Sequence, residues 1–210
     1  MDNYRPIALL SNFSKILEKV ICTRLMTFLD VNNLLSDSQF GFRKKHSTTH
    51  PLVHFMNFVS NAFNKKHHVI SIFCDLRKAF DTVNSKILFK KLFKLGIRNN
   101  ELLWFKNYLS NRKQFVCVNN KISSLKDVLL GVPQGSILGP ILFLLYINDL
   151  PNASLLYALL FADDTTLLAS GPNLNELFQH VNNEFHKIVY FFRKKKTCFT
   201  SCKNQIYDIF

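Results

Sequence analysis

The sequence lacks any hydrophobic run that could cross a membrane. A membrane-spanning helix needs about 18 or more consecutive apolar residues, and the longest candidate, residues 137–150, is broken by Gly139 and Pro140. Residues 1–6 also lack the basic-then-apolar order of a signal peptide. These absences predict a protein without a membrane partner.

Cysteines are few, odd in number and scattered, at positions 22, 74, 117, 198 and 202. Such a pattern predicts free thiols in a reducing compartment inside the cell. Cys198 and Cys202 have no second pair that would complete a zinc site, and His46, His50 and His54 recur at helical spacing without an acidic or cysteine partner. We therefore interpret the histidines as part of a helix surface.

Acidic residues are scarce relative to basic ones. The chain has 27 Lys and Arg against 14 Asp and Glu, which gives a formal net charge of +13. Basic side chains gain free energy when they displace counterions from phosphates, so this excess predicts a polyanionic partner. A membrane surface is disfavoured because no helix is both strongly amphipathic and basic along one face. Nucleic acid is the expected partner.

Two of the few acidic residues, Asp163 and Asp164, stand between apolar runs at 159–162 and 165–168. Short apolar runs bounded by polar residues predict buried strands, and the acidic pair lies where a hairpin would turn. Ionised carboxylates beside a core are costly unless they are paired or bind a metal. Taken alone, such a pair is more often a solvated turn.

A third carboxylate, Asp75, ends another apolar and β-branched run at 68–74. If the two strands lie side by side, Asp75 and Asp163 meet at one edge of the sheet. Carboxylates so placed suit two divalent ions about 3.5–4 Å apart, and an all-oxygen site prefers Mg²⁺. A lone Asp at the end of a strand is otherwise a common turn residue.

Three motifs together carry a family resemblance: FADD at 161–164, DLRKAFD at 75–81 and GVPQGSILGP at 131–140. In order and spacing they resemble the palm of a reverse transcriptase, and most closely that of jockey-like non-LTR retrotransposons. The resemblance extends from about Tyr4 to about Phe192. It implies an RNA-directed DNA polymerase with an RNA template, a DNA primer or target and dNTPs, in the cytoplasm and nucleus as for a retrotransposon protein.

The resemblance also implies roles for the acidic residues. Asp75 and Asp163 would hold two Mg²⁺ ions, with Mn²⁺ as an alternative, and Asp164 would close or orient their coordination. The primer 3′ hydroxyl would then attack the α-phosphate of a dNTP, and pyrophosphate would leave. Mutual repulsion raises the pKa values of clustered carboxylates, so we expect the site to need metal to remain fully ionised.

Five further residues are expected to contact or support the nucleotide. Phe80 occupies the position that packs under the sugar, where an aromatic ring leaves no room for a 2′ hydroxyl. Gln134 and Gly135 resemble the loop that supports the templating base. Arg43 lies in a basic loop suited to a triphosphate, and Lys203 is the nearest match to the proton donor for pyrophosphate. The simpler interpretations are a core phenylalanine and a solvated basic loop, and the residues around Lys203 fit the family poorly.

The order of predicted helices and strands indicates an α+β fold, in which helices cover one face of an antiparallel, ferredoxin-like sheet. Residues 1–66 would form part of the helical fingers and residues 67–210 the palm, with the thumb absent. In the fingers, two helices near 14–28 and 47–63 are predicted to bury the following side chains: Ile16, Leu17, Val20, Ile21, Leu25 and Phe28 from the first, and Leu52, Phe55, Met56, Val59 and Phe63 from the second.

Alternatives remain open at this point. Ser136 stands where group II intron maturases usually carry glycine, and Ala162 stands where viral RNA polymerases usually carry glycine. Both residues favour the retrotransposon enzyme. An inactive truncated remnant that at most binds nucleic acid is the non-enzymatic alternative. If the enzyme is intact, we expect a thumb and an endonuclease elsewhere on the same polyprotein.

Overall fold

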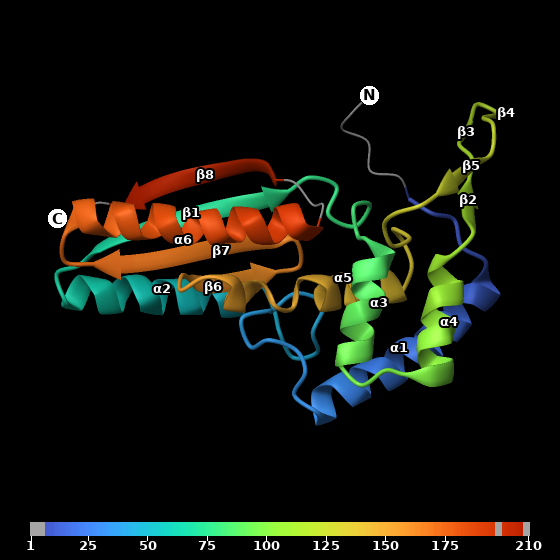
Figure 1. The fold of residues 1–210 in the computed structure, drawn as a ribbon, viewed down its shortest axis with the longest axis horizontal. Helices are drawn as coiled ribbons and strands as arrows, with labels where there is room; N and C mark the ends of the chain where they lie inside the picture. Colours follow the sequence, from blue (N-terminus) through green and yellow to red (C-terminus); the bar gives the residue numbers. More distant parts are fainter. Residues whose placement is uncertain (1–6, 196–198, 208–210) are drawn as a thin grey trace.

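A four-stranded antiparallel sheet forms the centre of the computed structural model, which describes residues 7–195 and 199–207 (Figure 1). Its strands are β1 (His68–Leu76), β6 (Tyr157–Phe161), β7 (Asp164–Gly171) and β8 (Phe199–Tyr207), in the spatial order β6-β7-β1-β8. β1 pairs with β7 on one side and with β8 on the other. The predicted α+β class and antiparallel sheet are confirmed.

Helices cover both faces of this sheet, so the prediction of helices on one face is wrong. Helix α6 (Leu174–Lys195) packs on β1 and β7, and helix α2 (Thr49–Asn64) packs on β1 and β6. Along β6, Leu160 joins the main core with Phe192 of α6, whereas its neighbour Leu159 joins a second cluster with Phe55 of α2. Successive side chains of a strand point to opposite faces, and β6 is apolar on both.

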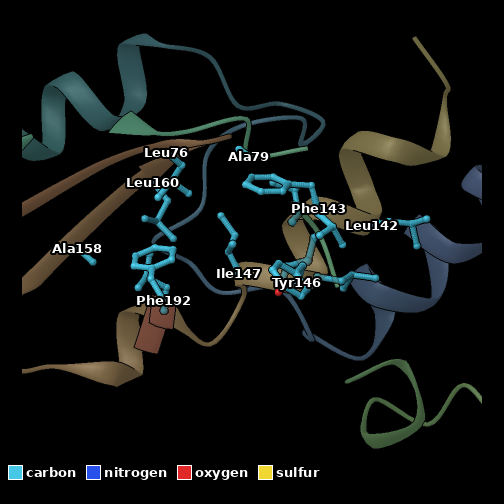
Figure 2. Packing of buried hydrophobic residues seen from close by; sticks show 14 of the residues in the cluster. Leu76, Ala79, Leu142, Phe143, Tyr146, Ile147, Ala158, Leu160 and Phe192 are labelled. Atoms are coloured by element: carbon cyan, nitrogen blue, oxygen red, sulfur yellow. The ribbon is translucent and has the colours of Figure 1, made fainter. Parts of the chain in front are cut away.

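Helix α5 (Leu138–Ile147) lies between the sheet and a second group of helices: α1 (Asn12–Val31), α3 (Ser85–Lys94) and α4 (Asn99–Leu109) (Figure 1). All residues of α5 except Pro140 are buried. Figure 2 shows Ile147 of α5 between Leu160 of the sheet and Phe143, and all three belong to the same hydrophobic cluster as Leu76. One continuous core therefore links the sheet to the helical part of the molecule.

Two short β-ladders follow α4. β2 (Arg112–Gln114) pairs with β5 (Lys126–Val128), and β3 (Cys117–Val118) pairs with β4 (Lys121–Ile122). Asn119 and Asn120 both adopt positive φ, at 48° and 59°. Positive φ at both central residues defines the type I′ turn that an Asn-rich hairpin favours. A 3₁₀ helix, η1 (Leu150–Ala153), precedes β6. None of the described helices has the length and hydropathy that a bilayer-spanning helix requires.

The buried faces of α1 and α2 agree with the prediction only in part: Leu25 is buried, and Ile21, Phe28 and Phe55 are partly buried against the core clusters. On α1, Ile16, Leu17 and Val20 are exposed, and the buried stripe consists of Glu18, Leu25, Met26 and Leu29. On α2, Leu52, Met56 and Phe63 are exposed, and only Ala62 is fully buried.

The buried face of α1 differs from the predicted one because it contains a carboxylate. Glu18 is 2 % exposed, accepts hydrogen bonds from the backbone N–H of Ile137 (2.7 Å) and the hydroxyl of Tyr108 (2.8 Å), and thus meets the start of α5. Because an acidic residue lies in the buried stripe, hydrophobic periodicity does not find that stripe.

Two lysines meet one carboxylate where α3, α5 and α6 join. Lys195 donates to Asp149 (2.6 Å) and to the carbonyl of Tyr146 (2.7 Å), and Lys91 donates to the same two residues. Burial alone would raise the pKa of the Asp149 carboxyl, but the hydrogen bonds from Lys195 and Lys91 together hold that pKa below its ordinary value of 3.8. Asp149 therefore links three helices electrostatically.

Changing Asp149 to Asn should lower the free energy of unfolding by about 1–2 kcal/mol near neutral pH, because it removes the carboxylate that accepts hydrogen bonds from both Lys91 and Lys195, although water screens part of this effect at the half-exposed carboxylate. A carboxyl whose pKa is lower in the folded state than in the unfolded state contributes its full stabilisation above the unfolded-state pKa. This stabilisation is lost as the pH falls through the folded-state pKa. The difference from the parent should therefore shrink below about pH 4. Urea unfolding at pH 7 and pH 3 measures both quantities.

The matched control is Asp127→Asn, since Asp127 and Lys113 are exposed and 4.0 Å apart. Its effect should stay below about 0.5 kcal/mol. An Asp149→Asn penalty that is equally large at both pH values would contradict the electrostatic explanation.

Candidate active site

The acidic pair lies at a tight hairpin between β6 and β7. Phe161 pairs with Asp164, so Ala162 and Asp163 form a two-residue turn. Ala162 has φ of 57°. Two-residue hairpin turns require positive φ at their first central position, where glycine or asparagine is usual. The predicted hairpin is confirmed, and it leaves Asp163 half-buried and Asp164 exposed.

Asp75 lies at the same end of the sheet as this turn. The register of β1 against β7 pairs Cys74 with Thr165. In an antiparallel pair, the next residues toward the turn are Asp75 on β1 and Asp164 on β7, and Asp163 follows. The expectation that Asp75 and the acidic turn share one edge of the sheet is thus met.

The three carboxylates do not converge fully. Among the residues that the structure describes, no three His, Cys, Asp or Glu side chains come close enough to hold a metal ion together. Neighbouring strands bring Asp75 and the acidic pair to one place, whereas the final placement of their oxygens depends on side-chain rotation. Their role as metal ligands therefore stays a prediction.

An open apolar hollow adjoins Asp164. It has a volume of 310 Å³ and lies between α2 and the sheet. Its lining residues are Pro51, Leu52, Phe55, Phe73, Leu159, Phe161, Asp164 and Thr166. The face of the sheet that carries the carboxylates is thus only partly covered by α2.

The loop between α1 and α2 packs directly against the acidic hairpin. The backbone N–H of Phe40 donates to the carbonyl of Leu160, and the N–H of Leu160 donates to the carbonyl of Ser38, both at 2.8 Å. Between them, the side chain of Gln39 is 1 % exposed and contacts Ala162. Sequence reasoning missed Gln39, because a single glutamine in a loop carries no periodic signal.

Arg43 is folded against its own loop rather than extended into solvent. Its Nη1 donates to the carbonyls of Ser36 (2.9 Å) and Gln39 (3.2 Å), and its Nε is buried without a hydrogen-bond partner. Arg43 is thus partly buried within a loop whose neighbouring residues Lys44 and Lys45 are exposed, so the alternative of a solvated basic loop stays open. A contact of Arg43 with a triphosphate stays a prediction.

Phe80 is half-buried between the core and the same loop. Its ring centroid lies 4.7 Å from that of Phe143 on α5 and 6.3 Å from that of Phe42, which meets it edge-on. One side of the ring therefore belongs to the core, as the simpler interpretation holds. The contact with Phe42 places Phe80 next to the loop that also touches the acidic hairpin.

Gln134 and Gly135 are engaged within the protein. The side-chain amide of Gln134 donates to the carboxylate of Asp81, and the backbone carbonyl of Gln134 accepts from the N–H of Ala8, both at 2.8 Å. Gly135 has φ of +93°, and a Cβ there would lie 3.2 Å from the carbonyl oxygen of Ala8. The N-terminal segment therefore lies close to the backbone at Gly135. A contact of either residue with a template stays a prediction.

The predicted proton donor, Lys203, lies on β8. Its backbone pairs with Phe73, two residues before Asp75 on β1. The Lys203 side chain lies outside the part of the chain that the structure describes, and so does Cys198. The assignment of Lys203 therefore stays a prediction.

The fold is shared with telomerase. A structure of telomerase from Candida albicans in complex with a TWJ fragment of telomeric RNA superposes with a TM-score of 0.69 at 12% identity, over 93% of this chain and 35% of that one. Apo telomerase from Candida tropicalis, truncated from the C-terminal domain, gives 0.63 at 14% identity over 93% and 41%. At such identities the likeness shows the fold alone.

Sequence comparison defines the family. The family described as reverse transcriptase (RNA-dependent DNA polymerase) matches residues 1–207, and the chain belongs to it. The chain is 36% identical over 189 residues to a probable RNA-directed DNA polymerase from transposon BS of Drosophila melanogaster. It is 35% identical over 186 residues to the RNA-directed DNA polymerase from mobile element jockey of the same fly. Each match covers 83% of this chain and 20% of the relative, so the chain spans about a fifth of these proteins. The predicted resemblance to non-LTR retrotransposon enzymes is confirmed.

Proposed function

We propose that this chain catalyses nucleotide addition in the RNA-directed DNA synthesis of a non-LTR retrotransposon, transferring dNTPs to a primer 3′ hydroxyl on an RNA template. The observation that carries the proposal is the common position of Asp75 and the Ala162–Asp163 turn at the ends of two paired central strands, in a reverse transcriptase domain. Residues 1–66 would act as part of the fingers and residues 67–210 as the palm.

The donor set at this edge fits hard divalent cations. Asp75, Asp163 and Asp164 offer only carboxylate oxygens, which suit Mg²⁺, with Mn²⁺ as an alternative. Asp75 and Asp163 would hold two ions, and Asp164 would orient them. When bound, such ions activate the attacking hydroxyl and stabilise the departing oxygen. The left-handed backbone of Ala162 supports a functional turn, because strain of this kind clusters at active sites.

The remaining site residues would position the nucleotide. Phe80, fixed against Phe143, would form a floor under the sugar and exclude a 2′ hydroxyl. Gln134, held by Asp81, would shape the loop under the templating base. Arg43 would bind the triphosphate, and Lys203 would donate a proton to the leaving pyrophosphate.

The proposed partners are an RNA template, a DNA primer or target and dNTPs. The net charge of +13 supports them. The free thiols of Cys22 and Cys117 support a reducing compartment, which would be the cytoplasm and nucleus. Because the chain spans about a fifth of its relatives, we place the thumb and endonuclease on the remainder of a polyprotein.

One observation favours a second candidate, an inactive remnant that binds nucleic acid: in the described residues the three acidic side chains do not converge. The discriminating experiment inserts the chain in the full-length jockey enzyme in place of the matching segment, and measures extension of a DNA primer on an RNA template in the presence and absence of Mg²⁺. Mg²⁺-dependent extension supports the enzyme, and binding without extension supports the remnant.

Affinity for an RNA–DNA hybrid should fall on the order of 10- to 1,000-fold between about 50 and 200 mM salt, because Lys and Arg contacts to phosphates release counterions. Fluorescence anisotropy with a labelled hybrid measures this dependence. An affinity that stays flat over this range would show that the basic residues form an ordinary solvated surface.

A further inference from the structure

The side chain of Gln39 is bonded to the backbone of the acidic turn. Its Oε1 accepts from the N–H of Ala162 (3.1 Å) and from the N–H of Gly41 (2.8 Å), and its Nε2 donates to the carbonyl of Ala162 (3.4 Å). One amide thus engages both polar groups of the first turn residue. Because only 1 % of the Gln39 surface is exposed, water does not readily replace these hydrogen bonds.

Ala162 needs such support because its backbone is left-handed. Residues other than Gly, Asn and Asp are disfavoured at positive φ, and they keep this conformation only when contacts with the surrounding structure enforce it. The residue next along the turn is Asp163. Any relaxation of Ala162 would therefore redirect the carboxylates of Asp163 and Asp164.

Gly41 allows the loop to approach the turn this closely. A Cβ on Gly41 would lie 2.2 Å from the backbone nitrogen of Ala162, so no other residue fits without moving loop or turn. The carbonyl of Gln39 is itself fixed by Nη1 of Arg43 at 3.2 Å. The loop therefore presents Gln39 from a fixed position.

We propose that Gln39 is a positioning residue for the reaction: its side-chain amide clamps Ala162 and thereby holds the backbone that carries Asp163 and Asp164 at the edge of the sheet where Asp75 lies. The catalytic part of this inference rests on the proposed function, whereas the hydrogen bonds between Gln39 and Ala162 do not depend on that function. Asp163 would bind divalent cations less well when the clamp is lost, since the groups that orient a metal ligand typically contribute about 10- to 100-fold in metal affinity.

The test compares the 210-residue chain with Gln39→Met, which keeps the length of the side chain and removes its hydrogen bonds. Asn148→Leu is the matched control, because Asn148 anchors the same loop through Ser36 (2.8 Å) and Leu34 (2.7 Å). Gln39→Glu is the conservative variant, because a carboxyl oxygen still accepts from Gly41 and Ala162.

Amide hydrogen exchange, followed by NMR, reads the clamp directly. In Gln39→Met the amides of Gly41 and Ala162 should exchange about tenfold faster, while those of Phe40 and Leu160, which bond to backbone carbonyls, should remain protected. Gln39→Glu should lie nearer the parent at Ala162, and Asn148→Leu should affect Ser36 alone. The clamp is disproved if Gln39→Met accelerates exchange at all four amides equally, or if the exchange rate of the Ala162 amide is the same as in the parent.

Binding of Mn²⁺, measured by electron paramagnetic resonance, reads the consequence. The parent should bind Mn²⁺, and Asp75→Asn should abolish this binding. Gln39→Met should bind Mn²⁺ about tenfold more weakly than the parent, and Asn148→Leu should bind it as tightly as the parent. A parent that binds no Mn²⁺ through Asp75 would overturn the proposed function while the exchange data still judge the clamp. Equal binding by parent and Gln39→Met would overturn the positioning role alone.

Discussion

Asp75→Asn and Asp163→Asn should each reduce primer extension on the order of 1,000-fold, with little change in affinity for an RNA–DNA hybrid. Metal ions stabilise the transition state by several kcal/mol, and each 1.36 kcal/mol is about tenfold in rate. An amide keeps the size of the carboxylate but loses the charge that holds the ions. Asp75 is exposed near the end of β1 and Asp163 lies in the β6–β7 turn, so neither belongs to the hydrophobic core.

The measurement needs the rest of the polymerase, because the chain spans about a fifth of its relatives. Extension should be measured with the chain inserted in the full-length jockey enzyme in place of the matching segment. Asp37→Asn, an exposed residue of the α1–α2 loop, is the control and should retain full activity. Extension by Asp75→Asn at the parental rate would show that the acidic pair and Asp75 form no metal site.

Phe80→Val should let the same chimaeric enzyme incorporate ribonucleotides, with a much smaller change for deoxynucleotides. Discrimination by a steric wall costs the rejected substrate a few kcal/mol, and each 1.4 kcal/mol is about tenfold. Removing the ring should therefore shift the ratio of the two efficiencies on the order of 100-fold. The kcat/KM values for dNTP and NTP, compared between parent and variant, give this ratio.

The control for Phe80 is Phe89→Val, since Phe89 on α3 is also half-buried against the main core. Both variants lose aromatic packing and should be destabilised by about 1–3 kcal/mol. Only Phe80→Val should change the sugar preference. An unchanged ratio would make Phe80 an ordinary core residue packed on Phe143.

The sheet and its acidic edge could be predicted because local signals agree there. The apolar runs before Asp75 and around Asp163 have the length and composition of strands, and the acidic pair is short enough to turn between them.

The layer arrangement and the support of the site could not be predicted in the same way. That α2 and α6 cover opposite faces is decided by tertiary contacts of β6, which is apolar at every position from Ala158 to Phe161. Glu18 and Gln39 are polar residues buried by partners more than 100 residues away, at Ile137 and Ala162. Neither spacing nor composition encodes such pairs. Arg43 was correctly placed in a loop, but its hydrogen bonds to the loop's own carbonyls depend on the folded path of that loop.

Asp75 and Asp163 are proposed to hold divalent ions at the edge of the sheet. Anomalous diffraction from crystals of the chain bound to an RNA–DNA hybrid and grown with Mn²⁺ would locate these ions. We expect two Mn²⁺ peaks about 3.5–4 Å apart, both coordinated by carboxylate oxygens of Asp75 and Asp163. Mn²⁺ bound elsewhere, or carboxylates of Asp75 and Asp163 directed to opposite faces of the sheet, would contradict the proposal.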